Sequence, residues 1–265
     1  ASHSLARLRK LCGDPLFVRA GHRMSPTPYG KQVCEAAQNA LRLLRDGFRG
    51  PQSFDATTSR RIFRLYMSEA GQLVVLPRLL AHLREVAPGV RLLVSRVPDE
   101  NPGHALEIGE IDLAIGHITS MTSGFHRTTL LEEQYVCIAC GQNAYFRRGM
   151  SLEGYQSALH AVADKSGMAH WVVDRALEVR GIKRQIGLVV PEFLALPFVI
   201  FGSEMIATVP KRVAERFAKL LPIEIFPMPI KLDSYEVLLL WHERSHIDAA
   251  NRWLRNTLTS LFKQN

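Results

Sequence analysis

Residues 62–97, IFRLYMSEAGQLVVLPRLLAHLREVAPGVRLLVSRV, decide the fold class of this chain. The run IFRLYMS predicts a buried strand, and Leu79, Leu80, Leu83 and Val86 then follow at helical spacing. The run VRLLVSRV predicts a second strand directly after that helix. A strand, a helix and a strand in this order predict an α/β unit.

The alternation of strands and helices continues to the end of the chain, where Asp248 is placed to cap a final helix. The other expected helices are 104–110, 151–157, 167–181, 193–203 and 211–220. The expected strands are 111–118, 135–140, 160–164, 185–190, 205–210, 223–230 and 235–243. This order favours an α/β protein with mainly parallel sheets.

The first sixty residues follow a different pattern. Leucines at helical spacing predict a short helix at 4–11, and the next twelve or so residues predict a hairpin around Gly21. Thr27 is expected to cap a helix that has Pro28 in its first position and runs to about Phe48. Its stripe of mostly small apolar residues favours a dimerisation or linker helix. The polar, turn-rich segment 50–60 predicts a domain boundary.

The basic charge of the chain is concentrated at its N-terminus. Residues 1–61 hold eleven of the 33 Lys and Arg residues and four of the 25 Asp and Glu residues, a net +7 of the total +8. The rest of the chain is therefore close to neutral. A basic module joined to a near-neutral body indicates a nucleic-acid contact together with a second activity, although a solvated basic surface would show the same charge.

The composition excludes several classes of protein. Hydrophobic residues are 47% and charged residues 22%, which fits a soluble globular chain. No apolar run reaches the roughly 18 residues of a transmembrane helix, and the basic, amphipathic start differs from a signal peptide. We therefore expect no membrane partner and a cytoplasmic protein. Cys12, Cys34, Cys137 and Cys140 are too sparse for a disulfide scaffold and fit a reducing compartment.

One string matches a metal motif. In WHERSHID, 241–248, the residues His242, Glu243 and His246 match the H-E-x-x-H pattern of zinc proteases. That chemistry needs both histidines on one helix face, whereas here a strand is expected to end near His242 and a helix to start near Asp248. No Asp or Glu follows Asp248 as a third ligand. We therefore expect no metal site at this string.

Other catalytic patterns are weak. Cys137 and Cys140 form a lone C-x-x-C in a predicted strand, so we expect core cysteines. His104, His126 and His160 have no carboxylate partner in the sequence and are expected to be structural or surface groups. No nucleotide-binding or nucleophile-elbow motif occurs. We expect no catalytic residues and no cofactor.

Several strings resemble the LysR-type transcriptional regulators. D-P-L-F-V-R at 14–19 and P-T-P-Y at 26–29 combine a helix stop, a wing strand and a helix cap in the order of that family. GEIDLAIG, YVCIA, VVPEF, IATVP and WHERSHIDAANRWLR extend the resemblance over nearly all of the 265 residues. The chain looks closest to the branch that answers to aromatic compounds.

The resemblance implies a two-lobed, periplasmic-binding-protein-like α/β effector domain preceded by a partial winged helix-turn-helix and a long linker helix. The implied divisions are 1–27 for the winged helix-turn-helix part, 28–50 for the linker or dimerisation helix, 51–59 for a hinge and 60–265 for the effector domain. Its first lobe would comprise 60–137 and 236–265, and its second lobe 138–235. In the family, about forty further residues complete the helix-turn-helix ahead of this sequence.

The N-terminal part is expected to contact promoter DNA, because a recognition helix places its first residues at base edges and basic side chains reach phosphates. The residues at these positions are Ser2, His3 and Ser4 at the helix start, Arg7 and Arg9 for phosphates, Arg19 and Arg23 on the wing, and Thr27 through its backbone amide.

The resemblance also places a small effector between the two lobes, at strand ends near helix N-termini. The family's cleft positions fall here on Ser68, Glu69, His117, Ser166, His170, Pro191, Glu192 and Phe193. Ser68 is expected to hold a carboxylate or phenol, His170 to hydrogen-bond a ligand, and Phe193 to stack on an aromatic ring.

Glu192 departs from the pattern of the aromatic-acid-sensing relatives, which carry a histidine in the corresponding string. A carboxylate there would repel an anionic inducer. We therefore expect a phenolic, neutral or cationic aromatic inducer, unless His117 or His170 neutralises Glu192 or its side chain points away.

Two classes of function stay open on the sequence alone. The first is a ligand-responsive DNA-binding regulator that acts as a homodimer or homotetramer. The second is a small-molecule binder or enzyme on a two-lobed α/β scaffold, with the basic N-terminus as an assembly arm. The charge distribution and the strings at 14–29 favour the regulator.

Overall fold

The computed structural model describes residues 2–21, 23–48, 54–95, 101–118, 123–141, 143, 149–163, 168–191 and 193–262, without the side chains of 2, 3, 45–48 and 168–171. The chain forms two compact units, 1–52 and 53–265. Each unit is described by itself below. Among the described helices, none combines the length and the hydropathy needed to cross a bilayer.

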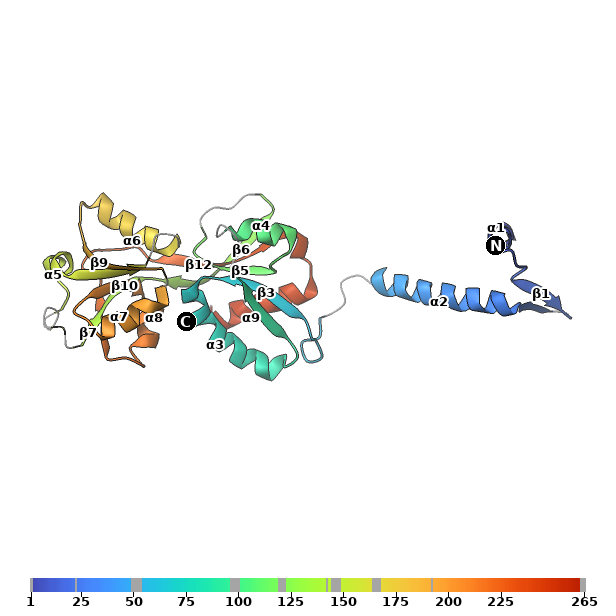
Figure 1. The fold of residues 1–265 in the computed structure, drawn as a ribbon, viewed down its shortest axis with the longest axis horizontal. Helices are drawn as coiled ribbons and strands as arrows, with labels where there is room; N and C mark the ends of the chain where they lie inside the picture. The colour runs from blue at the N-terminus through green and yellow to red at the C-terminus, as the bar shows by residue number, and fades with distance from the viewer. Residues whose placement is uncertain are drawn as a thin grey trace. The chain divides into compact units, whose positions relative to one another are not determined.

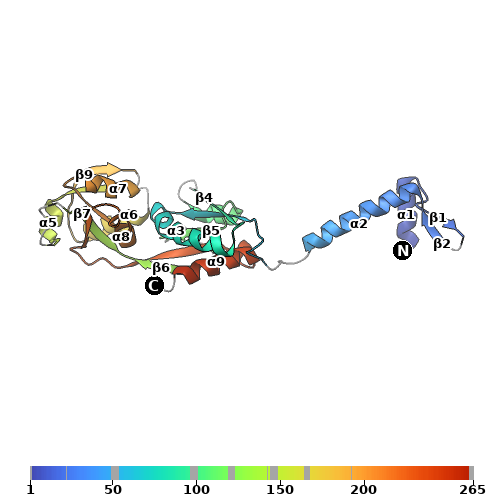
Figure 2. The same ribbon diagram turned by 90° about the horizontal axis from the view of Figure 1, so that it is seen from below.

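The first unit has the elements that the sequence predicts. Helix α1 (Ser2–Cys12) precedes the antiparallel strands β1 (Phe17–Ala20) and β2 (Arg23–Pro26), and α2 (Pro28–Phe48) follows (Figures 1 and 2). Gly21, at φ +63°, makes the turn of the hairpin. The hairpin and the long helix with Pro28 at its first position are therefore confirmed.

Hydrogen bonds around Leu16 explain the strings at 14–19 and 26–29. Leu16 is buried and has φ +60°, which is unusual for a residue with a side chain. The Asp14 carboxylate accepts from the Leu16 amide at 2.6 Å and from the Thr27 hydroxyl at 2.7 Å. Thr27 caps α2 by accepting from the Gly30 amide at 2.8 Å. A Cβ at Gly30 would lie 2.0 Å from the Leu16 carbonyl oxygen, so the contact requires glycine.

The second unit contains two five-stranded sheets. The first sheet has the order β4-β3-β5-β12-β6, from β3 (Ile62–Met67), β4 (Arg91–Ser95), β5 (Leu113–Gly116), β6 (Phe125–Glu133) and β12 (Tyr235–His242). The second has the order β11-β7-β10-β8-β9, from β7 (Tyr135–Cys140), β8 (Leu159–Ala163), β9 (Gln185–Val190), β10 (Ile206–Pro210) and β11 (Ile223–Pro227). The sheets with their helices form the two lobes (Figure 1).

Both sheets are mixed, so the expectation of mainly parallel sheets is wrong. In the first sheet β3 pairs in parallel with β4 and β5, but β12 is antiparallel to both β5 and β6. In the second sheet β10 and β9 are parallel to β8, while β7 is antiparallel to β10 and β11. The reversal arises because the strands that connect the lobes, β6, β7 and β12, do not follow a helical crossover.

Neighbouring residues of a strand point to opposite faces, and here residues on both faces are apolar. Helices therefore cover both faces of each sheet. In the first lobe, Leu113, Ile115 and Leu239 pack with α3 (Glu69–Val86) and α9 (Ala249–Phe262). Ala114 and Leu240 pack with α4 (Pro102–Ile108) on the opposite face.

The second lobe is built in the same way. Val136 and Ile138 belong to the core that includes α7 (Leu196–Phe201) and α8 (Lys211–Phe217). Cys137 and Ala139 face the core that includes α5 (Leu152–Ser157) and α6 (Met168–Val179). The expected helix 193–203 is divided into η3 (Phe193–Ala195) and α7.

The chain passes from the first sheet to the second at Gln134 and returns between β11 and β12. The first change of sheet falls three residues before the expected boundary after residue 137, because all of β7 pairs within the second sheet. The lobes also touch through α3, where Ala70, Leu73 and Val74 pack against the core of the second lobe.

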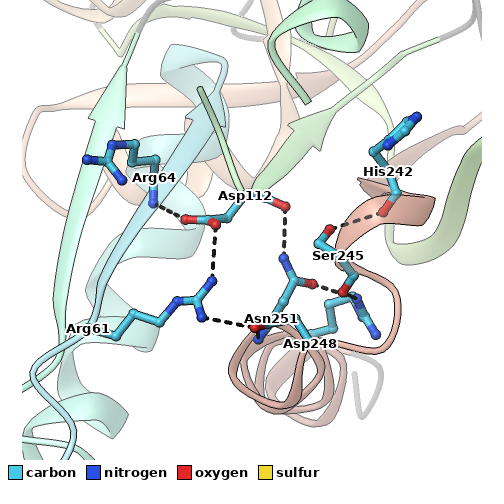
Figure 3. Close-up of polar contacts among 8 residues, drawn as sticks. Arg61, Arg64, Asp112, His242, Ser245, Asp248 and Asn251 are labelled. Atoms are coloured by element: carbon cyan, nitrogen blue, oxygen red, sulfur yellow. Dashed lines mark hydrogen bonds and ion pairs between the residues drawn. The ribbon is translucent and has the colours of Figure 1, made fainter. Parts of the chain in front are cut away.

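The string GEIDLAIG has a structural explanation at the amino ends of β3 and β5. The Asp112 carboxylate accepts from the Arg64 amide at 2.8 Å and pairs with Arg61 at 3.4 Å (Figure 3). Arg61 also pairs with Asp248 at 3.1 Å, and Asn251 donates to the Asp112 carbonyl at 3.0 Å. Asp248 caps α9 through the Asn251 amide at 2.6 Å, as the sequence predicts.

Candidate functional site

Ser68 lies at the start of α3, where β3 ends. Its hydroxyl accepts from the Gly71 amide, and the side chain is exposed. Met67, the last residue of β3, pairs with Ile115 of the parallel strand β5, so Ser68 is level with the carboxyl end of β5. Ligands of open α/β sheets bind at this end of the strands, and the partial positive charge of a helix N-terminus favours acidic or polar groups there.

Glu69, the next residue, joins the two lobes. Its carboxylate accepts from the amide of Phe193 at 3.0 Å and from the amide of Leu194 at 3.4 Å. Both amides belong to η3 at the start of the second lobe's α7, while Glu69 opens α3 of the first lobe. The sequence places Glu69 and Phe193 at the same site, and the structure brings them into contact.

His117 follows β5 and lies beside the connection between the lobes. Its Nδ1 is 3.2 Å from the Glu236 carbonyl oxygen, and its ring meets Tyr235 edge to face at 5.1 Å. Glu236 in turn accepts from the Thr129 hydroxyl at 2.5 Å. Tyr235 and Thr129 were not expected from the sequence, because the pairing of β12 with β5 brings Tyr235 near His117 and the pairing of β12 with β6 brings Thr129 near Glu236.

A buried carboxyl group lies at the passage from β6 to β7. Glu133 is 5% exposed, accepts from the Gln134 amide at 2.9 Å and lies 3.6 Å from the Arg212 guanidinium. Burial raises the pKa of Glu133, and Arg212 opposes that rise. Tyr135 and Tyr235, from the two connecting segments, stack at 5.1 Å, and burial raises the pKa of both. The passage between the two lobes is therefore a packed polar contact.

The remaining expected effector residues are described only in part. Ser166 and Glu192 lie outside the described residues, as does the side chain of His170, whose backbone is in α6. Pro191 is exposed, and Phe193 is partly buried against the second lobe's core. The described part of the site thus consists of Ser68, Glu69, His117, Pro191 and Phe193.

The expected DNA-binding residues on α1 and α2 differ in their surroundings. Ser4 and Arg7 are exposed on α1, and the side chains of Ser2 and His3 are outside the described residues. Arg9 donates to the Pro15 carbonyl at 2.7 Å, so it holds the turn after α1. The Thr27 amide donates to the Leu16 carbonyl at 3.0 Å, so this amide is engaged within the chain.

The two wing arginines lie on opposite faces of the hairpin. Arg19 pairs with Met24 and Ala20 with Arg23, and adjacent pairs of a ladder point to alternate faces. Both arginines are exposed. A nucleic acid lying along one face of the hairpin would therefore meet one of them directly, and the other would reach it around the tip.

The H-E-x-x-H string does not form the helix of a zinc protease. His242 is the last residue of β12, and Glu243–Ser245 form the short 3-10 helix η4, so His242 and His246 are not on one helix face. Cys137 has the expected core position and burial raises its pKa to about 12, whereas Cys140 is only partly buried; no disulfide links the described cysteines. His126, however, does have a carboxylate partner, Glu243.

Comparisons with known proteins identify the family. The model of the LysR substrate binding domain matches residues 56–263. The chain is 34% identical to the HTH-type transcriptional activator NahR of Pseudomonas putida, over 98% of this chain and 87% of that protein. It is 35% identical to the HTH-type transcriptional regulator LinR of Sphingobium indicum, over 97% and 86%.

Solved structures show the same arrangement. A protein of Pseudomonas aeruginosa described as a probable transcriptional regulator matches 98% of this chain and 86% of its own, with 30% identity and a TM-score of 0.72. The regulatory domain of MexT, a transcriptional activator of the same organism, matches 77% of this chain and 99% of its own, with 28% identity and a TM-score of 0.67.

The two α/β lobes match the substrate-binding domain of a class of ligand-binding transcriptional regulators. The chain belongs to the LysR family of transcriptional regulators. The expected α/β class with a periplasmic-binding-protein-like effector domain is confirmed.

Proposed function

We propose that this regulator binds promoter DNA as a homo-oligomer in the cytoplasm and responds to a small aromatic compound held between its two lobes. The divisions at 1–27, 28–50, 51–59 and 60–265 then correspond to DNA contact, dimerisation, hinge and effector binding. The named relatives are HTH-type regulators that align with nearly the whole chain, which supports the DNA-binding part.

The observation that carries the effector part is the contact of Glu69 with the amides of Phe193 and Leu194. A carboxylate from one lobe accepts hydrogen bonds from the other lobe at the ends of β3 and β5. A ligand that enters here changes the free energy of the contact between the lobes. Such a differential interaction is what a ligand needs in order to shift a conformational equilibrium.

The aromatic class of the effector rests on Phe193 and on the family resemblance. Phe193 is only partly buried and lies next to Glu69, so its ring can stack on a planar ligand. Glu69 places a carboxyl group at this end of the site, and the family resemblance assigns a second acidic residue, Glu192, to the same cleft. Two carboxylates favour a phenolic, neutral or cationic aromatic compound over an aromatic acid.

The DNA-binding proposal is tested with the full-length protein on the DNA upstream of its own gene. We expect a mobility shift that weakens steeply with salt and that is lost with Arg7→Ala and Arg23→Ala together, because phosphate contacts release counterions. An Arg127→Ala variant, which changes an exposed arginine of β6, is the control. Salt-independent binding, or equal binding by all three proteins, would contradict the proposal.

The effector proposal is tested by thermal shift with two series of ligands, hydroxylated benzenes and the matching benzoates. A ligand at about one hundred times its Kd should stabilise the protein by roughly 2.7 kcal/mol. We expect the phenols to raise Tm and Phe193→Ala to abolish the rise. A strong rise with benzoates alone would refute the charge argument, and no rise with either series would refute the aromatic class.

A further inference from the structure

The strongest unassigned cluster of side chains in the described residues lies at the edge of the first lobe. His126 comes from β6, and Glu243 and His246 come from the turn after β12. One ligand atom from each residue lies within 4.8 Å of the other two. Two imidazoles and one carboxylate are a donor set typical of zinc and related transition metals, whereas calcium and magnesium prefer oxygen donors alone.

We propose that His126, Glu243 and His246 form a surface site for a divalent transition metal of the zinc class. The site links the edge strand of the first lobe to the turn that leads into the C-terminal helix. It is separate from the effector site, which lies at the carboxyl ends of β3 and β5.

The distances suit such an ion after a small movement. Bonds of about 2.0–2.2 Å in a tetrahedral site place ligand atoms roughly 3.3 Å apart, and the ligand atoms here lie within 4.8 Å of one another, so a separation at that limit must close by roughly 1.5 Å. The rings of His126 and His246 stack at 4.1 Å, and one ring must turn about its Cβ–Cγ bond for both nitrogens to face one ion. The His126 side chain is 36% exposed and has room to turn.

The turn that carries two of the donors is held firmly. The Arg255 guanidinium, which is buried, donates to the Ser245 carbonyl at 3.3 Å and to the His246 carbonyl at 2.9 Å. The Glu243 amide donates to the Gly124 carbonyl at 2.9 Å, which ties the turn to the start of β6. Because the backbone positions are set by the fold, binding an ion requires side-chain rotation alone.

Trp241 connects the cluster to a spectroscopic signal. Its indole stacks on His126 at 5.5 Å and on His246 at 6.2 Å, and its Nε1–H donates to Nδ1 of His246 at 3.1 Å. Nδ1 of His246 therefore carries a free electron pair toward Trp241 rather than a proton. An ion that takes this nitrogen replaces the indole N–H, so binding changes the surroundings of the indole.

The open face of the site limits its chemistry. The Glu243 side chain is 61% exposed and His246 is half-buried, so water completes the coordination of an ion with three protein ligands. The elements that hold the donors are not those of a zinc protease, because His242 caps η4 and does not belong to the cluster. The proposed role of the ion is structural: it would link the edge strand β6 to the turn after β12, without catalysing hydrolysis.

The test titrates untagged full-length protein with Zn²⁺ by calorimetry and follows tryptophan fluorescence with Ni²⁺, which quenches nearby indoles. We expect saturable binding of one ion and a weakening of at least about tenfold for His126→Ala and His246→Ala. Glu243→Gln, an exposed and isosteric change, should weaken binding without affecting the fold. Trp241→Phe should bind Zn²⁺ but lose most of the quenching.

His104→Ala is the matched control, because His104 is an exposed histidine of the same lobe with a carboxylate, Glu107, at 3.8 Å. It should bind Zn²⁺ within about twofold of the parent protein. The absence of saturable binding in the parent protein would overturn the proposal. Equal affinity in all variants, or an equal loss of affinity for His104→Ala, would show that Zn²⁺ binds to scattered surface histidines. Either result would also overturn the proposal.

Discussion

At the scale of single residues, His160 is the most deeply buried of the histidines whose side chains the structure describes. It has no exposed surface, and its Nε2–H donates to the Tyr155 carbonyl at 2.6 Å. Its Nδ1 has no hydrogen-bond partner among the described residues. Burial lowers the pKa of His160 from 6.5 to about 4. The imidazole is therefore neutral in the folded protein at neutral pH.

This burial predicts a loss of stability in mild acid. As pH falls from 6.5 towards 4, the unfolded chain binds a proton at His160 and the folded chain does not, so the free energy of unfolding decreases. The loss amounts to about 2.5 kcal/mol at pH 4.5, and the stability is fully present above pH 6.5. We expect His160→Gln, which keeps a donor for Tyr155, to lack this part of the acid dependence.

The measurement is urea unfolding at pH 7 and pH 4.5 for the parent protein, His160→Gln and His104→Gln. The variant at the exposed His104 should lose as much stability as the parent. If His160→Gln also loses as much, the buried imidazole is not the group responsible.

Residue roles were predictable where the signal is local. Thr27 and Asp248 cap the helices that the sequence assigns to them, because a cap acts on amides three residues away. The contact of His126 with Glu243 joins residues 117 positions apart, and no local pattern marks it. His126 lies opposite Trp241 only because β6 and β12 pair in one register.

At the scale of elements, α3 is the helix that reaches both lobes. Val74 packs against the cores of both, and Glu69 at the start of α3 accepts from two amides of η3. A helix that belongs to one lobe and packs against the other changes its contacts when the relative position of the lobes changes.

Removing the Glu69 carboxylate should therefore loosen the contact between the lobes. We expect Glu69→Ala to lower the free energy of unfolding by roughly 1.5–3 kcal/mol, the range for hydrogen bonds to a charged group. The radius of gyration from small-angle scattering should rise, and the effector concentration at half-maximal response should change. Glu153→Ala is the control, since Glu153 lies in the first turn of α5 and is exposed. An equal effect of both changes would argue against an interlobe role.

The sequence predicted most elements but not the direction of the strands. Periodicity shows which residues are buried, and it carries no information about whether neighbouring strands run parallel. Strand β6 was missed because FHRTTLLEE mixes charged, hydroxyl and apolar residues. It lies at the edge of its sheet and pairs only with β12 among the described strands. Glu133, the last residue of this strand and part of the passage between the lobes, was missed with it.

At the scale of the whole molecule, α2 exposes an apolar surface within its own unit. Leu41 is 53% exposed and Leu44 is 54% exposed, one turn apart on a 21-residue helix. Exposed leucines in such a row are typical of a helix that packs against a partner, and a second copy of the same helix would bury them.

We expect Leu41→Lys with Leu44→Lys to convert the oligomer to a smaller species, measured by light scattering after gel filtration. DNA binding should weaken at least about tenfold, because each subunit then binds a single half-site alone. Gln38→Lys with Asn39→Lys adds the same charge to exposed polar positions of the helix. That control should keep the oligomer and the affinity. A parent-like mass for the leucine variant would rule out α2 as the oligomer contact.

The position of β12 has a consequence for the order in which the chain can assemble. The described strands of the second lobe all lie between Tyr135 and Pro227, so they are complete before the last part of the chain is made. In the first lobe, β12 lies between β5 and β6, and α9 completes the core. During synthesis the sheet of the first lobe therefore stays incomplete, with β5 and β6 unpaired, until β12 is made. This holds although most residues of the first lobe leave the ribosome before those of the second.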